Sequence, residues 1–323
     1  MEKINKKLIS IVSPAYNEAE NIPLIVEEVK RVMVGLKEKY DFEYILVNDG
    51  STDDTWEAIL KEAKKDPRIK GICFSRNFGH QMALTAGLDH AKGDAVIYCD
   101  SDLQHPPNIF PKLIKEWEKG FDVVHTKRVK TEGEPFFKRL MSNLFYKVVN
   151  RFSNVRIEEG MADFKLLDKK VLGKLSYMRE HDRFLRGMIP WLGFKSSIVE
   201  YNANKRIHGT SWYSFRRNLH FAKSGILAFS VKPLKYIGYL GVFLVVSSLL
   251  VLIFGFFGSL FNKIGYFEFF SPTFTLTMFN TFLMGLVLTS LGIIALYVSN
   301  IYYEVLNRPL YVISDRTFED DKK

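Results

Sequence analysis

Two long stretches in the second half of this 323-residue sequence contain no charged side chain, at 236–261 and 269–303. A helix that crosses a bilayer needs about 20 predominantly apolar residues, and each stretch is long enough. A buried hydrophobic hairpin inside a globular domain is the alternative. We expect two membrane-spanning helices, at about 236–261 and 273–300, joined by a loop that holds Lys263 and Glu268.

Basic residues flank this pair of stretches, with Lys232 and Lys235 before it and Arg308 and Arg316 after it. Lys and Arg near the ends of a span favour the cytoplasmic side, which predicts that both termini lie in the cytoplasm. The run Leu8–Val12 is too short for the core of a signal peptide. The expected parts are a cytoplasmic domain at 1–213, juxtamembrane amphipathic helices at 214–235, a membrane hairpin at 236–303 and a cytoplasmic tail at 304–323.

Two further segments mix apolar and basic side chains, at 135–152 and 214–235. A basic amphipathic helix is typical of a membrane surface. An ordinary surface helix packed on the domain is the alternative for the first segment. The net charge of +9 also fits anionic lipid or phosphorylated substrates. No nucleic-acid-binding signature is found, so we expect no nucleic-acid partner.

The first half of the chain alternates strand-like and helical patterns. Such alternation favours an α/β fold with a mostly parallel sheet and helices on both faces. The two cysteines, Cys73 and Cys99, fall in strand-like runs, which favours buried thiols over a disulfide scaffold. The expected strands are 8–12, 44–47, 69–74 and 95–99, and the expected helices are 20–39, 52–64 and 81–91.

Polar clusters follow three of these strands, at Pro14–Glu18, Asp49–Ser51 and Asp100–Gln104. Ligands of such sheets bind beyond the carboxyl ends of the strands, so these clusters should converge. The Asp100-Ser101-Asp102 sequence places two carboxylates near one another, and Gln104 adds an oxygen. Hard divalent cations take oxygen ligands and share them with substrate phosphates. An ordinary surface loop is the alternative.

Other strand-end residues suggest contacts to a nucleotide. Tyr16 and Glu18 could hold a base or ribose, and Asp49 could accept hydrogen bonds from the same groups. The segment Ser75–His80 is rich in side-chain donors, and Arg128 follows another strand-like run. Arginine suits bidentate contacts to phosphate, although a single arginine is more often a solvated surface charge.

Taken together, several stretches resemble family 2 glycosyltransferases of the GT-A fold. The similarity is greatest to polyprenyl-phosphate glycosyltransferases, the group that contains dolichol-phosphate mannose synthases and bactoprenol glucosyltransferases. The expected membrane hairpin resembles the bactoprenol branch. The matching stretches are Ser13–Glu18, Asn48–Asp53, Ser75–Gln81, Asp100–Gln104, Ala162–Asp168 and Arg183–Gly187.

The resemblance implies a role for each matching position. The resemblance makes Asp163 the candidate general base. A strong base is not chemically required, however, because an acceptor phosphate monoester with a second pKa of about 6 is already largely an oxyanion. Asp163 could orient a group instead. The implied sites are Pro14, Tyr16, Glu18 and Asp49 for the nucleotide, Asp100 and Ser101 for the sugar-nucleotide end, Asp102 and Gln104 with Asp100 for Mg²⁺ or Mn²⁺, Arg128, Arg206 and Ser211 for phosphates, and Asp163, Asp102 and Arg128 for catalysis.

The implied reaction is an inverting, metal-dependent hexosyl transfer from a nucleotide-diphosphate sugar, with UDP-glucose favoured, to polyprenyl (undecaprenyl) phosphate at the cytoplasmic membrane face. UDP-N-acetylglucosamine and GDP-mannose are alternative donors. A processive polysaccharide synthase is disfavoured because its Gln-x-x-Arg-Trp motif is missing from the sequence. A catalytically inactive nucleotide-sugar-binding or scaffold protein is the alternative of another class. A homo-oligomer and a flippase partner are further expectations.

Two positions depart from the family pattern. His105 stands where many relatives carry Asp, and Trp212 stands where many carry Lys. The first substitution changes a neighbour of the acidic cluster, and the second removes a cation near the expected acceptor phosphate.

Overall fold

The computed structural model describes residues 6–129, 161–181, 183–204 and 272–319, together with 239–241, 243, 246, 247 and 250. The chain divides into two compact units. The first, here called the sheet domain, contains the described residues before 205 and those from Pro309 onward. The second, the apolar unit, contains the described residues from 239 to Arg308.

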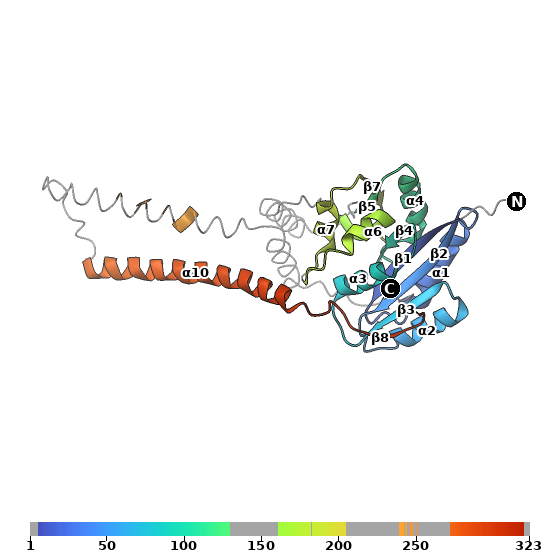
Figure 1. The fold of residues 1–323 in the computed structure, drawn as a ribbon, viewed down its shortest axis with the longest axis horizontal. Coiled ribbons are helices and arrows are strands. Elements are labelled where there is room, and N and C mark those ends of the chain that lie inside the picture. The colour runs from blue at the N-terminus through green and yellow to red at the C-terminus, as the bar shows by residue number, and fades with distance from the viewer. Residues whose placement is uncertain are drawn as a thin grey trace. The chain divides into compact units, whose positions relative to one another are not determined.

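An eight-stranded sheet forms the centre of the sheet domain, in the order β7-β5-β6-β4-β1-β2-β3-β8 (Figure 1). Strand β1 pairs in parallel with β2 and β4, as does β2 with β3 and β5 with β7. Strand β6 runs antiparallel between β4 and β5, and β8 runs antiparallel to β3. The strands are β1 (Lys7–Ala15), β2 (Tyr40–Asn48), β3 (Ile69–Phe74), β4 (Ala95–Tyr98), β5 (Val123–Arg128), β6 (Met161–Asp168), β7 (Ser196–Tyr201) and β8 (Ile313–Arg316).

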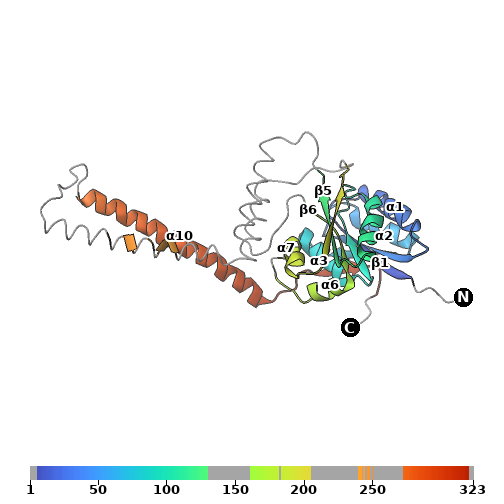
Figure 2. The same cartoon turned by 90° about the horizontal axis from the view of Figure 1, so that it is seen from above.

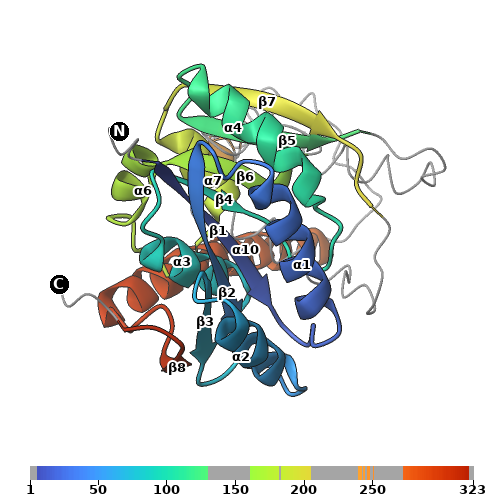
Figure 3. The ribbon, with the colours of Figure 1, turned by 90° about the vertical axis from the view of Figure 1, so that its right-hand side faces the viewer.

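Helices cover both faces of this sheet, with α1, α2 and α4 on one face and α3, α6 and α7 on the other (Figure 2). Strands β7 and β8 form its two edges (Figure 3). The prediction of an α/β fold with a mostly parallel sheet is therefore confirmed. The helices are α1 (Asn21–Val34), α2 (Thr55–Lys65), α3 (His80–His90), α4 (Phe110–Glu118, after a short 3₁₀ turn at Pro107–Ile109), α6 (Lys169–Leu175) and α7 (Leu185–Trp191).

The packing of α1 and α3 follows from their sequences. Helix α1 buries Ile22, Ile25, Val26 and Val29, at the spacing of one helical face. It ends at Val34, earlier than the expected residue 39. Helix α3 lies close to β1 because Gly87 has no side chain: a Cβ there would come within 2.2 Å of a Val12 methyl carbon. This close approach fixes the position of α3 on the sheet.

The apolar unit contains one long helix, α10 (Pro272–Leu306). At 1.5 Å per residue, its 35 residues span roughly 50 Å, more than the hydrocarbon core of a bilayer. The most apolar 18-residue window of its segment Phe282–Leu306 has a mean hydropathy of 2.1, and none of that window is buried. Among the described residues, this is the one helix long and apolar enough to cross a membrane.

Helix α10 coincides with the second expected span and extends it to Leu306. Most of the first expected span falls outside the described residues, so the two-helix hairpin stays a prediction. The two amphipathic segments, 135–152 and 214–235, also lie outside them. The expected tail contains strand β8, which pairs with β3 and so belongs to the sheet.

Candidate functional site

The loops that follow β1, β2, β3 and β4 emerge together at the carboxyl edge of the sheet, where the parallel strands end. They do so because these four strands are parallel neighbours. The first two loops are tied together by Asn17, which has a left-handed backbone with φ of 56°. The Asn17 backbone N–H donates to Ser51 Oγ at 3.0 Å, and the Thr52 N–H donates to Asn17 Oδ1 at 2.9 Å. The predicted convergence of the strand-end clusters is therefore present.

Asp49 connects the second loop to the third. Its carboxylate accepts hydrogen bonds from the backbone N–H of Phe78 at 2.7 Å and of Gly79 at 3.0 Å. Burial raises the pKa of Asp49, and these backbone bonds offset only part of the increase. The neighbouring Gly50 has φ of 64°, and a Cβ there would lie 2.3 Å from the Arg76 carbonyl carbon. Glycine is therefore required where these two loops meet.

His80 at the start of α3 connects the third loop to the fourth. Its Nε2 lies 2.8 Å from Asp100 Oδ1, and about one third of each side chain is exposed. Burial alone would lower the pKa of His80, but the hydrogen bond and charge of Asp100 raise it overall. Burial alone would raise the pKa of Asp100, but His105 and His80 hold it below its ordinary value. The pair therefore favours an imidazolium beside a carboxylate.

The acidic turn after β4 is tightly shaped. Leu103 adopts a left-handed backbone with φ of 62°, a conformation that costs of order 1–3 kcal/mol for a residue with a side chain. Asp102 Oδ1 accepts the N–H of Gln104 at 3.1 Å, and Ser101 Oγ donates to the Pro14 carbonyl at 2.9 Å. Asp100, Asp102 and Gln104 therefore share one short turn beside the first loop.

The oxygen atoms of this turn are of the type that Mg²⁺ and Mn²⁺ bind. Within the described ranges, no group of three or more His, Cys, Asp or Glu side chains is placed to hold a metal ion. A metal that is shared with substrate phosphates needs only one or two protein carboxylates. The donor set of Asp102, Asp100 and Gln104 fits that kind of site.

His105 supports the acidic turn from the interior. Its ring stacks on Phe164 with centroids 5.2 Å apart, and its Nδ1 accepts the backbone N–H of Asp100 at 3.0 Å. Because Nδ1 accepts that bond, its 3.5 Å separation from Asp100 Oδ2 is not a donated hydrogen bond. The imidazole thus supplies a hydrogen-bond acceptor to the backbone of the acidic turn.

Asp163 lies on β6 and is paired with Arg186 of α7. Arg186 Nε donates to Asp163 Oδ1 at 2.8 Å, and Asp163 is buried. Burial alone would raise the pKa of Asp163, but Arg186, with smaller contributions from His80 and Lys165, holds it far below its ordinary value. A carboxylate in this state is a weak base. Our sequence reasoning assigned no role to Arg186, although it lies in the matching stretch Arg183–Gly187.

A row of buried polar side chains crosses the sheet at one register, with Tyr98 on β4, Lys165 on β6 and His125 on β5. Among the described residues, no hydrogen-bond partner is found for the Tyr98 hydroxyl, Lys165 Nζ or His125 Nδ1. Burial lowers the pKa of Lys165 to about 8, although the Asp163 carboxylate opposes part of the decrease. Burial, with a smaller effect of the Lys165 charge, lowers the pKa of His125 to about 3. Sequence reasoning did not single out this row.

The other predicted site residues lie as follows. Tyr16 is exposed after β1, and Glu18 accepts a hydrogen bond from the Asn21 amide. Arg128 is exposed at the end of β5, where its backbone pairs with that of Tyr201 on β7. Arg206 and Ser211 fall outside the described residues, as does the departure at Trp212.

These features define a class of protein: an α/β enzyme whose polar loops meet at the carboxyl edge of a mostly parallel sheet, with an acidic turn among them. The model of glycosyl transferase family 2 matches residues 10–176. The chain belongs to this family and is a glycosyltransferase.

Curated relatives align with nearly the whole chain. The putative glycosyltransferase CsbB of Bacillus subtilis is 39% identical over 95% of this chain and 92% of the relative. The glycosyltransferase YkcC of the same organism is 38% identical over 94% and 92%. A prophage-derived bactoprenol glucosyl transferase of Shigella flexneri is 37% identical over 94% and 97%. The family resemblance found in the sequence is therefore confirmed.

Proposed function

We propose that this chain transfers a hexose from a nucleotide-diphosphate sugar, with UDP-glucose the best fit, to polyprenyl phosphate at the cytoplasmic face of a membrane. The observation that carries the proposal is the acidic turn Asp100–Gln104, joined by hydrogen bonds to the neighbouring loops, in a chain that also contains the apolar helix α10. The name of the Shigella flexneri relative supports the lipid acceptor and the glucosyl donor.

The donor would bind across the linked loops, with Mg²⁺ or Mn²⁺ held by Asp102 together with Gln104 and Asp100. A bound metal would neutralise charge that develops on the nucleotide-diphosphate leaving group. His80 restrains the Asp100 carboxylate at 2.8 Å, so the acidic turn can keep its shape as the donor enters and leaves. Pro14, Tyr16, Glu18 and Asp49 would surround the nucleotide, and Ser101 would lie near its sugar end.

The acceptor phosphate needs positioning more than deprotonation. Its oxygen would attack the anomeric carbon as the bond from that carbon to the nucleotide diphosphate breaks, which inverts the anomeric configuration. At neutral pH the acceptor is already largely ionised. Because Asp163 is bound to Arg186 and is a weak base, we assign Asp163 the role of orienting Arg186 toward a phosphate. Arg128, Arg206 and Ser211 would make further phosphate contacts.

The topology proposed with this reaction has two membrane spans, both termini in the cytoplasm and the sheet domain at the membrane surface. An apolar helix such as α10 would hold the enzyme where a polyprenyl chain is dissolved. UDP-N-acetylglucosamine and GDP-mannose are the donors to compare with UDP-glucose. A homo-oligomeric assembly and a flippase partner stay predictions.

A radiolabelled transfer assay tests this proposal. Purified full-length protein in lipid nanodiscs would be given undecaprenyl phosphate and each of the three donors, with Mg²⁺, Mn²⁺ or a chelator. We expect labelled lipid from one donor, and its loss on chelation. Asp102→Asn should lower transfer by roughly a hundredfold or more, because the loss of a metal ligand removes several kcal/mol of leaving-group stabilisation.

Asp54→Asn is the matched control, since Asp54 is an exposed carboxylate at the start of α2. It should transfer at the wild-type rate. Full transfer by Asp102→Asn, or full transfer by the wild type in chelator, would refute the metal role. Release of free sugar to water, with no labelled lipid from any donor, would refute the lipid acceptor.

A further inference from the structure

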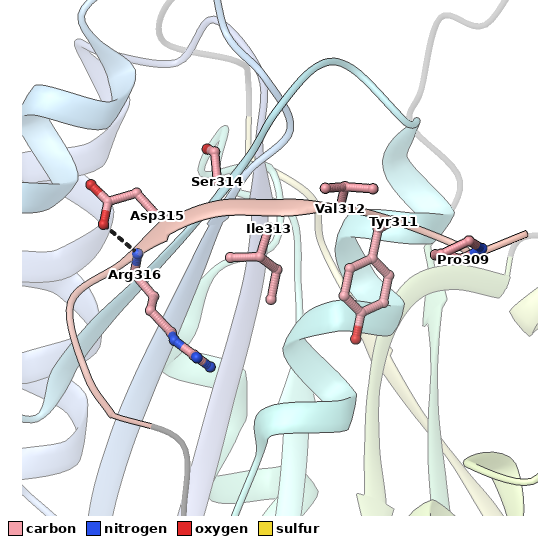
Figure 4. Close-up of a pocket in the computed structure, with 7 residues that line it drawn as sticks. All are labelled: Pro309, Tyr311, Val312, Ile313, Ser314, Asp315 and Arg316. Atoms are coloured by element: carbon pink, nitrogen blue, oxygen red, sulfur yellow. Dashed lines mark hydrogen bonds between the residues drawn. The ribbon is translucent and has the colours of Figure 1, made fainter. Parts of the chain in front are cut away.

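Beyond α10 the chain re-enters the sheet domain and forms its edge strand β8. Backbone pairing aligns Phe74 with Ile313 and Ile72 with Arg316. The Ser75 N–H also donates to the Val312 carbonyl at 3.0 Å, which binds the start of the third strand-end loop to this segment. A hollow lies along β8, lined by residues of the segment 309–316 (Figure 4).

Tyr311 is the anchor of this segment. Its ring stacks on Phe74 with centroids 5.2 Å apart and an interplanar angle of 12°. Its hydroxyl donates to Asp89 Oδ2 at 2.9 Å, and the same oxygen accepts from Arg179 at 2.7 Å. Burial and the Asp89 carboxylate raise the pKa of Tyr311, so the hydroxyl keeps its proton. In Figure 4 the side chains of Tyr311 and Ile313 extend from the same side of the strand.

A continuous path of contacts leads from Tyr311 to the predicted nucleotide site. Phe74 meets the ring of Phe78 edge to face, with centroids 5.6 Å apart. The Phe78 N–H donates to Asp49 at 2.7 Å, the shortest of the bonds that join the second and third loops. The loop Ser75–Gly79 is therefore held at one end by β8 and at the other end by Asp49.

We propose that Tyr311 is a positioning residue for the donor nucleotide: through Phe74 and Phe78 it sets the loop that Asp49 binds. This inference rests on the proposed function, because it assumes that the loops after β2 and β3 hold the nucleotide. The segment after the apolar helix is then part of the donor site, although none of its residues was expected there.

Nucleotide binding to full-length protein in nanodiscs tests this inference, with UDP and Mn²⁺ as the probe in calorimetry. In Tyr311→Ala both the aromatic stack and the hydroxyl are lost. Its Kd for UDP and its KM for the donor should rise roughly three- to tenfold, the range for loss of one aromatic pair. The kcat at saturating donor should stay within about twofold of wild type, because the interaction orients the ground-state complex.

Tyr311→Phe keeps the stack and loses only the bond to Asp89, so its Kd should rise less, by about two- to threefold. Val312→Ala is the control, because Val312 uses only its backbone carbonyl and its side chain is exposed. Hydrogen exchange of the Phe78 and Gly79 amides should quicken in Tyr311→Ala and not in the control.

The outcomes separate the two proposals. Wild-type protein that binds no UDP would refute the nucleotide site itself. Wild-type binding with unchanged binding by Tyr311→Ala would refute only the positioning role. A Tyr311→Ala variant that loses thermal stability and kcat, while its KM and its Phe78 exchange stay at wild-type values, would also refute that role.

Discussion

Two regions of the sheet domain differ in how their charged and polar side chains are paired. One is the edge of the sheet from which the strand-end loops emerge, and the other is the buried polar row beneath it. At the edge, His80 pairs with Asp100 and Arg186 pairs with Asp163. In the row formed by Tyr98, Lys165 and His125, the three polar atoms named above have no hydrogen-bond partner within the described part of the chain. A buried polar group without a partner costs free energy, whereas a paired one costs much less. The paired charges therefore hold the strand-end loops in a defined geometry. The polar row lowers the free energy of unfolding.

Breaking the Arg186–Asp163 pair at the loop edge should have the largest effect on the free energy of unfolding. Arg186→Met would leave the buried Asp163 carboxylate without its main partner, which typically costs 3 to 5 kcal/mol. The pKa of Asp163 should then rise. Denaturant unfolding of the full-length protein, followed by tryptophan fluorescence, measures the loss.

Arg31→Met is the control for that variant, because Arg31 pairs with Glu28 on the exposed surface of α1. Surface pairs contribute about 0 to 1 kcal/mol. An equal loss of stability in both variants would show that the edge pair is no different from a surface pair.

Removing the charge of Lys165 from the row should raise the free energy of unfolding, by less than Arg186→Met lowers it. Lys165→Met should stabilise the protein by about 1 to 3 kcal/mol at pH 7. The buried ammonium has no hydrogen-bond partner among the described residues, and Met replaces it with an uncharged side chain of similar length. The exposed Lys112 provides the control, and Lys112→Met should change stability by less than about 0.5 kcal/mol.

The pH dependence of that stabilisation has a definite sign. The pKa of Lys165 is about 8 in the folded protein, below its ordinary 10.5, so the unfolded chain binds more protons between these values. The free energy of unfolding of the wild type should therefore rise as Lys165 loses its proton between pH 8 and pH 10.5. The advantage of Lys165→Met should shrink over the same interval, and a constant advantage would contradict the assignment.

The smallest expected effect concerns the pH dependence of transfer. Because Arg186 holds the pKa of Asp163 far below neutrality, that carboxylate should not titrate in the working range. The rate should follow ionisation of the acceptor phosphate, with a midpoint of about pH 6. Asp163→Asn should lower the rate and leave this midpoint in place. A midpoint that disappears in the variant would identify Asp163 as a general base.

Much of the edge could be predicted from local sequence. The apolar run at β3 gave its bounds, Ile69–Phe74, without tertiary information. Polar clusters directly after strands predicted that Asp49 and Asp100 would converge at one edge. The bonds from Asp49 to Phe78 and from His80 to Asp100 were not predicted, because partners distant in sequence are chosen only when the helices and strands pack.

The row and the edge strand β8 lay beyond sequence reasoning for a related reason. Lys165 interrupts the apolar pattern of β6, and a lysine in a sequence is normally read as exposed. Strand β8 is only four residues long and contains Asp315 and Arg316, so it has no apolar alternation. Its strand conformation depends on pairing with β3, which is more than 230 residues away in sequence.

The pairing of β8 with β3 also sets an order of events during biosynthesis. Strands β1 to β7 leave the ribosome before α10, and β8 can join the sheet only after α10 has been synthesised. Until then β3 presents an unpaired edge, which invites association with other chains. The nascent enzyme therefore completes the sheet of its catalytic domain only after its apolar helix is made.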